Sequence, residues 1–353
     1  LEIYMIRPTL DHLPPPPAGK TGWPWTEAPD PLPEVMQDDR SWPRITVVTP
    51  SYNQGQFIEE TIRSILLQGY PNLEYFIMDG GSSDNTVEVI RRYEPWISRW
   101  VSERDRGQTH AINKGWQQAT GSVITWLNSD DYYPPHALRH VGQAFAATPN
   151  LAMAFGDSQA VDEHGAFLHR RDMSQFTQKT LLFGQSMAQP AVFNHIRVIE
   201  DQGLLKEELY YVMDFEFFLR AWHFYDSNEI AYLPHSLANE RKWSGCKTLT
   251  GNFADEWLET VEKFFREHPD KYRQQGDLIR KAYSGGYRKK AILQARHGQR
   301  LAAQINAVRS ARFYPGLVPR LRRLVRLTLK IWFGQKTVNR AGRMRRRLSR
   351  ALA

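Results

Sequence analysis

From Arg44 onward, short apolar runs alternate with segments of helical spacing, and this alternation constrains the fold more than any other feature of the chain. The apolar runs lie at about 45–49, 74–78, 100–102, 122–127 and 151–156. The helical segments lie at about 53–66, 86–93, 107–119 and 136–147, with Asn53 expected as the first N-cap. Strands alternating with helices form a parallel, doubly wound sheet. We therefore predict an α/β fold with a Rossmann-like, mostly parallel sheet and a helical C-terminal extension.

Three polar clusters follow three of these predicted strands: Thr49–Asn53, Asp79–Asp84 and Asn128–Asp131. Parallel strands end at the same edge of a sheet, and ligands bind beyond that edge. The clusters are far apart in sequence but are expected to converge in space. The pattern therefore favours one binding site over three unrelated turns.

The third cluster indicates the chemistry of that site. An apolar run stops at Asn128, and Asp130 and Asp131 follow at once. Adjacent acids after a buried strand need a neutralising partner. Oxygen ligands suit Mg²⁺ or Mn²⁺, which commonly binds substrate phosphates as well. A simple acidic turn is the alternative interpretation.

The other two clusters suit a nucleotide. Asp79, followed by two glycines, is placed to accept from a base N–H, although a local Asx turn would use the same residues. At the first strand end, Tyr52 is expected to stack on a base and nearby N–H groups to meet phosphate. Helix capping is the simpler alternative there. Further hydrogen-bond donors for an anionic ligand are expected at Asp105–Gln108, Asn113 and Lys114. The alternative is that these residues form a solvated loop and helix face.

Two later segments offer groups for proton and phosphate chemistry. Asp214 and Glu216 lie in an aromatic setting that would suit a carboxylate to proton abstraction; acids at a helix start are the alternative. Further on, a Gly-containing loop carries basic residues able to neutralise a leaving diphosphate: Arg241, Lys242 and Lys247. His235 is a weaker candidate for a third metal ligand, since lone histidines are more often structural.

Charge is divided sharply along the chain. Residues 278–353 contain 21 Lys and Arg and no acid, which leaves 25 basic and 38 acidic residues, a net charge of −13, in residues 1–277. Within the tail, residues 317–333 place Leu, Val, Ile and Trp on one helical arc and most of the Arg and Lys opposite. This pattern, with the Arg343–Arg350 cluster beyond it, favours an anionic membrane surface. Docking on the protein body and nucleic-acid binding are the alternatives.

The chain is expected to have three parts. Residues 1–44 hold 10 of the 21 prolines and form an extended arm, residues 45–253 form the α/β domain, and residues 254–353 form a helical, basic region. The N-terminal residues lack a signal-peptide pattern, and no run is apolar enough to span a membrane. The single cysteine, Cys246, excludes an internal disulfide.

Residues 45–162 closely resemble the family 2 glycosyltransferases. The resemblance rests on ITVVTPSYNQGQFIEETIRSIL, YFIMDGGSSDNT, DRGQTHAINKG and WLNSDDYYPPHAL, in this order. It continues more weakly through Gln189, Asp214 and the basic loop. The resemblance implies a GT-A fold, a nucleotide-sugar donor, most often a uridine one, and a divalent metal ion.

The resemblance also implies roles for individual residues. Asp79 would bind the base, and the pocket would be lined by Thr49, Pro50, Ser51, Tyr52, Gln108, Asn113, Asn128, Asp131 and Arg241. Asp130 would be the metal ligand and Asp214 the catalytic base. Two positions depart from the family pattern, because Asn128 stands for an Asp and Trp243 for a His.

We therefore predict an inverting glycosyltransferase that acts in polysaccharide or lipid-linked glycan synthesis. It would attach peripherally to the cytoplasmic face of the plasma membrane, with a glycan or lipid-linked acceptor and no nucleic-acid partner. The alternative is a non-catalytic nucleotide-binding protein whose tail grips nucleic acid. A nucleotidyltransferase is disfavoured, since its first strand should lead into a basic, Gly-rich loop and TPSYNQG has no Lys or Arg.

Overall fold

The computed structural model describes residues 7–247 and 253–313, and the chain divides into two compact units. The first unit comprises Leu1–Phe176 and Met187–Leu249, and the second comprises Thr177–Ser186 and Thr250–Ala353. The short segment 177–186 thus belongs with the C-terminal helices. The predicted amphipathic segment 317–333 and the Arg343–Arg350 cluster lie outside the described residues.

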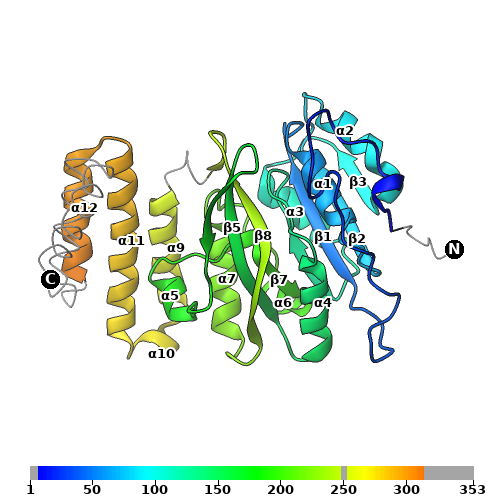
Figure 1. The fold of residues 1–353 in the computed structure, drawn as a ribbon. Helices are drawn as coiled ribbons and strands as arrows, with labels where there is room; N and C mark the ends of the chain where they lie inside the picture. The colour runs from blue at the N-terminus through cyan, green and yellow to red at the C-terminus, as the bar shows by residue number, and fades with distance from the viewer. Residues whose placement is uncertain (1–6, 248–252, 314–353) are drawn as a thin grey trace, which may run out of the picture. The chain divides into compact units, whose positions relative to one another are not determined.

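The first unit is built on an eight-stranded sheet of order β3-β2-β1-β4-β7-β5-β6, with β8 also paired to β5 (Figure 1). The strands are β1 Ile45–Ser51, β2 Leu73–Asp79, β3 Arg99–Ser102, β4 Val123–Trp126, β5 Met153–Asp162, β6 Phe167–Arg171, β7 Val192–His195 and β8 Ile230–Lys242. Strands β1 to β4 are mutually parallel, as are β5 and β8, whereas β6 and β7 pair antiparallel with their neighbours. The predicted mostly parallel α/β fold is confirmed.

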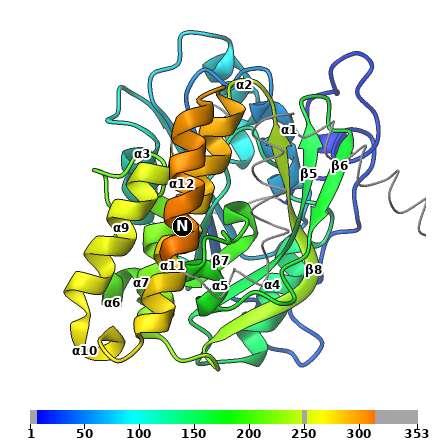
Figure 2. The same cartoon turned by 90° about the vertical axis from the view of Figure 1, so that its left-hand side faces the viewer.

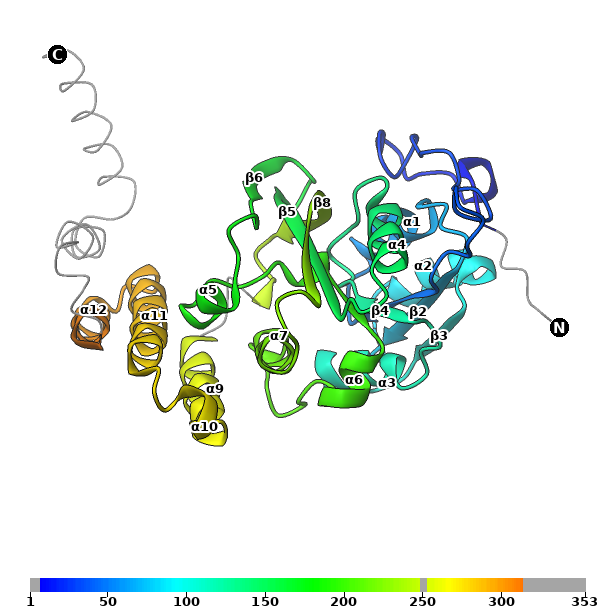
Figure 3. The same cartoon turned by 90° about the horizontal axis from the view of Figure 1, so that it is seen from below.

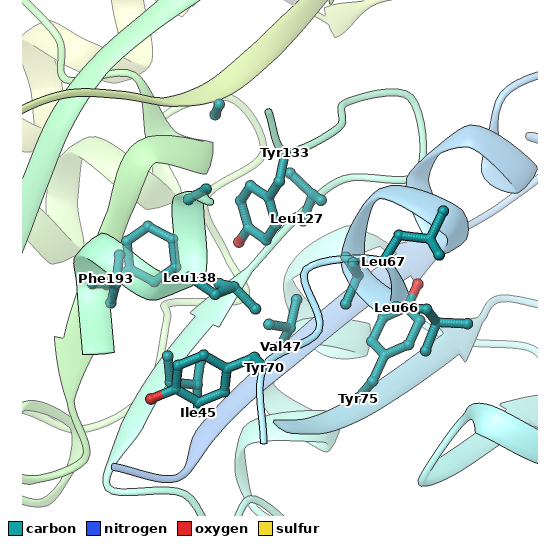
Figure 4. Packing of buried hydrophobic residues seen from close by; sticks show 14 of the residues in the cluster. Ile45, Val47, Leu66, Leu67, Tyr70, Tyr75, Leu127, Tyr133, Leu138 and Phe193 are labelled. Atoms are coloured by element: carbon teal, nitrogen blue, oxygen red, sulfur yellow. The ribbon is translucent and has the colours of Figure 1, made fainter. Parts of the chain in front are cut away.

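Helices follow the strands as the alternation predicts. They are α1 Ile58–Leu66, α2 Thr86–Tyr93, α3 Gln108–Trp116, α4 Ala137–Ala147, α6 Arg197–Gln202 and α7 Met213–Phe224. Strand β1 is buried along its whole length, as a central parallel strand of β-branched residues should be. Its Ile45 and Val47 belong to the core that also contains Leu138 and Phe193 (Figure 4).

The start of α1 differs from the expectation. Asn53 does not cap the helix, which begins at Ile58 after Phe57. Asn53 instead adopts φ 52°, a left-handed conformation that Asn tolerates, and its Oδ1 accepts from the backbone N–H of Ser83 at 2.9 Å. This hydrogen bond connects the loop after β1 to the loop after β2. Asn53 therefore stabilises the loops at the edge of the sheet and does not cap the helix.

The proline-rich arm belongs to the first unit and packs against its helix α1. The buried guanidinium of Arg63 donates to the carbonyl oxygens of Pro24 and Trp25, both at 3.0 Å, and lies over the Trp25 ring. The indole N–H of Trp23 donates at 2.8 Å to the carbonyl of Tyr133, just beyond the two acids. The arm thus reaches the chain segment that follows the acidic pair.

The second unit is helical. Its elements are α5 Gln178–Leu182, α9 Phe253–Glu267, α10 Pro269–Tyr272, α11 Gly276–Arg296 and α12 Arg300–Phe313. Figures 2 and 3 show α11 and α12 side by side, and Ser284 and Ser310 meet between them with hydroxyl oxygens 3.1 Å apart. None of the helices in the described part of the chain is long and apolar enough to cross a membrane.

Candidate active site

The carboxyl ends of the first four strands bring the three polar clusters together. Ser51 pairs with Asp79, and Asp79 pairs with Ser102, in successive parallel ladders. The backbone N–H of Leu127, at the end of β4, donates to the Val48 carbonyl at 2.9 Å. Leu127 and Tyr133 lie on either side of the two acids, and both are buried in the core (Figure 4). Their burial fixes the segment between them, Asn128–Tyr132, which we call the acidic loop.

Asp79 organises the turn that follows β2. Its Oδ2 accepts from the backbone N–H groups of Gly81 at 3.1 Å and Ser82 at 2.9 Å, and from the Ser102 hydroxyl at 2.6 Å. Asp79 as a whole is only 2% exposed. A base N–H would therefore share an acceptor that already holds the turn.

The segment after β1 presents one side chain outward. Thr49 and Pro50 are buried, and the Thr49 hydroxyl accepts from Tyr75 at 3.2 Å. The buried Ser51 hydroxyl has no hydrogen-bond partner among the described residues, an uncommon state for a buried polar group. Tyr52, by contrast, is 61% exposed, which leaves its ring accessible for stacking.

A line of polar side chains connects α3 to the acidic loop. Gln108 donates from Nε2 to Asn128 Oδ1 at 2.6 Å, and Asn128 Nδ2 is 3.3 Å from both Asp131 Oδ2 and Gln189 Oε1. From the basic loop, Lys247 Nζ donates to Gln108 Oε1 at 2.9 Å. The ammonium group also lies 4.0 Å from the ring centroid of Tyr210. The lysine therefore stands at this site, next to Gln108 and Asn128.

Asp130 is the acid that remains partly exposed. Its Oδ2 accepts from the indole N–H of Trp243 at 2.9 Å, and the Trp243 ring packs edge-on against Phe57. Burial raises the pKa of the Asp130 carboxyl, while the indole N–H opposes the rise. An uncharged donor thus holds the carboxylate at a position where the sequence resemblance leads us to expect a histidine. Sequence reasoning missed this contact because nothing in the pattern pairs the two residues.

Asp131 is buried and fully engaged. Its Oδ1 accepts from the backbone N–H of Arg241 at 2.8 Å, and burial, followed by the neighbouring Asp130 charge, raises its pKa well above the usual range. The Arg241 side chain is 1% exposed, forms an ion pair with Glu60 at 2.8 Å and donates to the Asp130 carbonyl at 2.9 Å. Arg241 therefore supports the acidic loop from the protein interior. Its partner Glu60 was not predicted from the sequence.

Asn113 is also turned inward. Its amide exchanges two hydrogen bonds with the backbone of Leu205, at 2.8 and 3.1 Å, and the side chain is buried. Both hydrogen-bonding ends of the amide are thus occupied by the chain. The residue fixes the segment that leads toward α7.

The two acids of α7 have different surroundings. Asp214 is half-buried in the first turn, and its Oδ1 accepts from the backbone N–H of Phe215 at 2.7 Å. Glu216 is buried and paired with Arg220 at 2.9 Å and Lys206 at 2.6 Å. Of the two carboxylates, Asp214 is the one that reaches the surface.

The residues fit a divalent ion that is shared with a ligand. In residues 7–247 and 253–313, no three His, Cys, Asp or Glu side chains are grouped to hold a metal by themselves. Asp130 nevertheless offers a partly exposed carboxylate beside a second buried acid, and Mg²⁺ or Mn²⁺ commonly takes one or two protein carboxylates with substrate phosphates. His235 is not part of this site, since it stacks on His140 with ring centroids 3.6 Å apart.

Comparisons with known proteins indicate one family for the segment that carries this site. The sequence model of the family described as "Glycosyl transferase family 2" matches residues 46–201. An uncharacterized glycosyltransferase of Nostoc sp. is 29% identical over 129 residues, covering 34% of this chain and 40% of that protein. TuaG of Bacillus subtilis, which carries the name of a teichuronic acid biosynthesis glycosyltransferase, is 37% identical over 92 residues, covering 25% of this chain and 36% of that protein. The chain thus spans about two fifths of the length of such relatives.

Among solved structures, Staphylococcus aureus TarS 1–349 in complex with UDP-GlcNAc superposes with a TM-score of 0.59 at 17% identity, covering 85% of this chain and 92% of that one. A likeness at this identity concerns the fold. Because the sequence match covers the segment that forms β1 to β4 and the acidic loop, fold and sequence point to the same family. Residues 46–201 therefore carry the sequence of a family 2 glycosyltransferase, in a chain with the GT-A fold.

Proposed function

We propose that this protein transfers a sugar from a nucleoside-diphosphate sugar, with uridine as the expected base, to an acceptor hydroxyl with inversion at the anomeric carbon. The observation that carries the proposal is the pairing of a partly exposed Asp130 with a buried Asp131 at the edge where the Asp79 turn also ends. The UDP-GlcNAc complex of TarS supports a uridine donor.

The donor would lie across the ends of β1, β2 and β4. Tyr52 offers its exposed ring to the base, Asp79 shares its carboxylate with a base N–H, and the unpaired Ser51 hydroxyl offers a further polar contact. Gln108 and Asn128 line the path toward the diphosphate. We assign Asn113 and Arg241 to positioning, because their side chains are buried and bonded to the chain itself.

Asp130 would hold Mg²⁺ or Mn²⁺ together with the donor phosphates. When bound, the ion neutralises the diphosphate and stabilises its departure. Asp131 stays behind Asp130 as a buried acid, held by Asn128 and by the Arg241 backbone. Asn128 thus supports the acidic loop with its amide in place of a second charged ligand.

The chain's own groups would carry the transfer. Asp214 accepts the proton of the acceptor hydroxyl, and the resulting oxygen attacks the anomeric carbon from the face opposite the leaving group. The bond from that carbon to the diphosphate oxygen breaks, and its electron pair leaves with the nucleoside diphosphate. Lys247, held near Gln108 and Asn128, stabilises the charge that develops on the leaving group.

The acceptor would be a growing glycan or a lipid-linked glycan. The basic sequence after residue 277 supports attachment to an anionic membrane surface. The name of TuaG, which refers to teichuronic acid biosynthesis, supports a polysaccharide product. The enzyme would then work peripherally at the cytoplasmic face of the membrane.

Calorimetric titration with UDP, GDP and dTDP, each with and without Mn²⁺, tests the proposal. Metal-dependent binding of UDP is expected, and Asp130→Asn should remove the metal dependence. Asp214→Asn should keep that binding but lose at least about a thousandfold in transfer to the acceptor, because a catalytic base contributes on this order. Absence of binding for all three nucleotides would contradict the proposed donor site, and full transfer by Asp214→Asn would remove Asp214 as base.

A further inference from the structure

Helix α12 has two opposite faces, both lacking acidic residues. One face packs within the helical unit and consists of small or amide side chains, all buried: Ala303, Asn306, Ala307 and Ser310. Ser310 marks where that face meets α11, because its hydroxyl donates to the Ser284 carbonyl at 2.7 Å. At about 100° per residue, the centre of the opposite face falls near Leu301, Ile305 and Val308.

These three side chains form an exposed apolar stripe. Leu301 is 72% exposed, Ile305 is 46% exposed and Val308 is 63% exposed. Their spacing of four and three residues aligns them along one line of the helix. Single exposed apolar residues are ordinary, but three in register on the face that points away from α11 indicate a contact surface.

The charge around the stripe indicates which kind of partner would bind there. Residues 278–313 contain nine Lys and Arg and no Asp or Glu. Arg300, Arg309 and Arg312 are exposed on the same helix. A second copy would bring identical arginines face to face, and the chain after residue 313, with twelve basic residues and no acid, would add further like charge. An anionic surface is complementary to both the stripe and its arginines.

We propose that the outer face of α12 is a membrane-docking surface for anionic lipid. Leu301, Ile305 and Val308 enter the boundary between headgroups and acyl chains, with the helix axis parallel to the bilayer plane. The flanking arginines lie at the level of the phosphates. The inference rests on the proposed membrane attachment but assigns part of it to a folded helix of the described chain.

A fluorophore at the stripe tests the contact directly. In the full-length chain with Cys246→Ser, nitrobenzoxadiazole is attached at Ile305→Cys, and the matched control carries it at Glu259→Cys, an exposed position on α9. Vesicles of phosphatidylcholine with about 30% phosphatidylglycerol should shift the emission of the label at 305 to the blue and allow quenching by lipid-borne nitroxides. The label at 259 should not respond, and neither label should respond to pure phosphatidylcholine.

Co-sedimentation separates this inference from the broader proposal. Ile305→Ser/Val308→Ser should lower the vesicle partition coefficient about tenfold, since two inserted side chains are lost. Val35→Ser/Leu168→Ser, which removes two exposed apolar residues from the first unit, should leave it unchanged. If Ile305→Ser/Val308→Ser sediments with vesicles as fully as the wild type, and the emission of the label at 305 does not shift, the proposed α12 surface is wrong. The broader proposal of membrane attachment would not be contradicted by that result. If the wild-type chain does not sediment with anionic vesicles at all, both the α12 surface and the proposed membrane attachment are wrong.

Two other outcomes would also overturn the proposal. A label at 305 that is already blue-shifted without vesicles would mean that the chain's own later residues cover the stripe. A wild-type dimer that Ile305→Ser/Val308→Ser converts to monomers in light scattering would make the stripe an interface between copies.

Discussion

Trp243 shows how one side chain can alter the charge of a site without breaking its geometry. Its indole N–H holds Asp130 as a hydrogen-bond donor, but an indole cannot carry the positive charge that a protonated histidine would bring. Arg241 is committed to Glu60, and Lys242 lies against Glu240 at 3.1 Å. Arg241 and Lys242 belong to the end of β8 and not to the loop predicted from the sequence, so the positive charge beside Gln108 comes from Lys247.

Replacing Lys247 should separate its role from that of its basic neighbour. Lys247→Met should lower kcat about tenfold to a hundredfold, because a charged donor to the leaving group is lost, with a smaller effect on donor binding. The matched control is Lys242→Met, which removes the same charge from a position paired with Glu240. Steady-state kinetics measures both, and equal losses in the two variants would show that only net charge matters.

The stacked pair of His140 and His235 should make folding sensitive to acid. Burial, then repulsion from His235, Arg139 and His136, lowers the pKa of His140 to about 4. An unfolded histidine titrates near 6.5, so the unfolded state binds more protons between these values. Stability is therefore full above about pH 6.5 and falls as the pH drops toward 4.

The effect should be modest, about 1 kcal/mol, because the ring is only partly buried and solvent screens it. His140→Gln should lose less free energy of unfolding than the wild type between pH 7 and pH 4, as measured by urea denaturation. The exposed His169→Gln serves as the control. If both variants follow the wild type, the stack does not contribute to acid sensitivity.

At the scale of elements, α1 is the part that joins the arm to the acidic loop. Arg63 binds the arm, the Thr61 hydroxyl donates to the Asp131 carbonyl at 2.7 Å, and the Ser64 hydroxyl accepts from the Tyr133 N–H at 3.1 Å. Trp23 adds a second hold on Tyr133 from the arm itself. The loop that carries Asp130 is thus fixed from a helix and from the proline-rich arm.

The arm should consequently influence the site. Trp23→Phe keeps an aromatic ring but removes the donor to Tyr133, and we expect the Mn²⁺ concentration for half-maximal activity to rise several-fold. Trp42→Phe is the matched control, since its indole N–H donates at 3.0 Å to Pro33 within the arm. Each variant loses one hydrogen bond, which should lower the free energy of unfolding by about 1 kcal/mol, and thermal denaturation measures this loss in both. A metal requirement unchanged in Trp23→Phe would confine the arm to a stabilising role.

Elements were more predictable from sequence than side-chain directions. Apolar periodicity and the strand-end clusters predicted β1 to β4 and their convergence, because those patterns are local. The inward orientations of Arg241 and Asn113 were not predictable, since their partners Glu60 and Leu205 lie 181 and 92 positions away. Asn53 failed as a cap for the same reason, because its partner Ser83 belongs to another strand's loop.

At the scale of the whole molecule, charge is divided along the sequence. The acidic part contains the entire first unit, and the acid-free part begins after Asp277, within α11. Attraction to an anionic surface would therefore act on one end of the chain while the net-negative remainder is repelled. Such a division favours attachment through the C-terminal part of the chain.

Deleting residues 314–353 should weaken binding to anionic vesicles at least tenfold while leaving α12 complete. The deletion removes twelve basic residues, each worth about 1 kcal/mol when it lies near such a surface. Co-sedimentation across a salt series measures the change, and the salt dependence should become shallower. Binding as strong as that of the full chain, with the same salt dependence, would exclude the tail as a membrane contact.

The contact between Trp243 and Asp130 also gives the protein an optical reporter. Indole emission responds to nearby charge, and this indole is bonded to the carboxylate that a metal ion and a diphosphate would approach. Subtracting the emission spectrum of Trp243→Phe from that of the wild type isolates this signal from the other tryptophans. Events at the acidic loop can thus be followed in real time, without a label and before the acceptor has been identified.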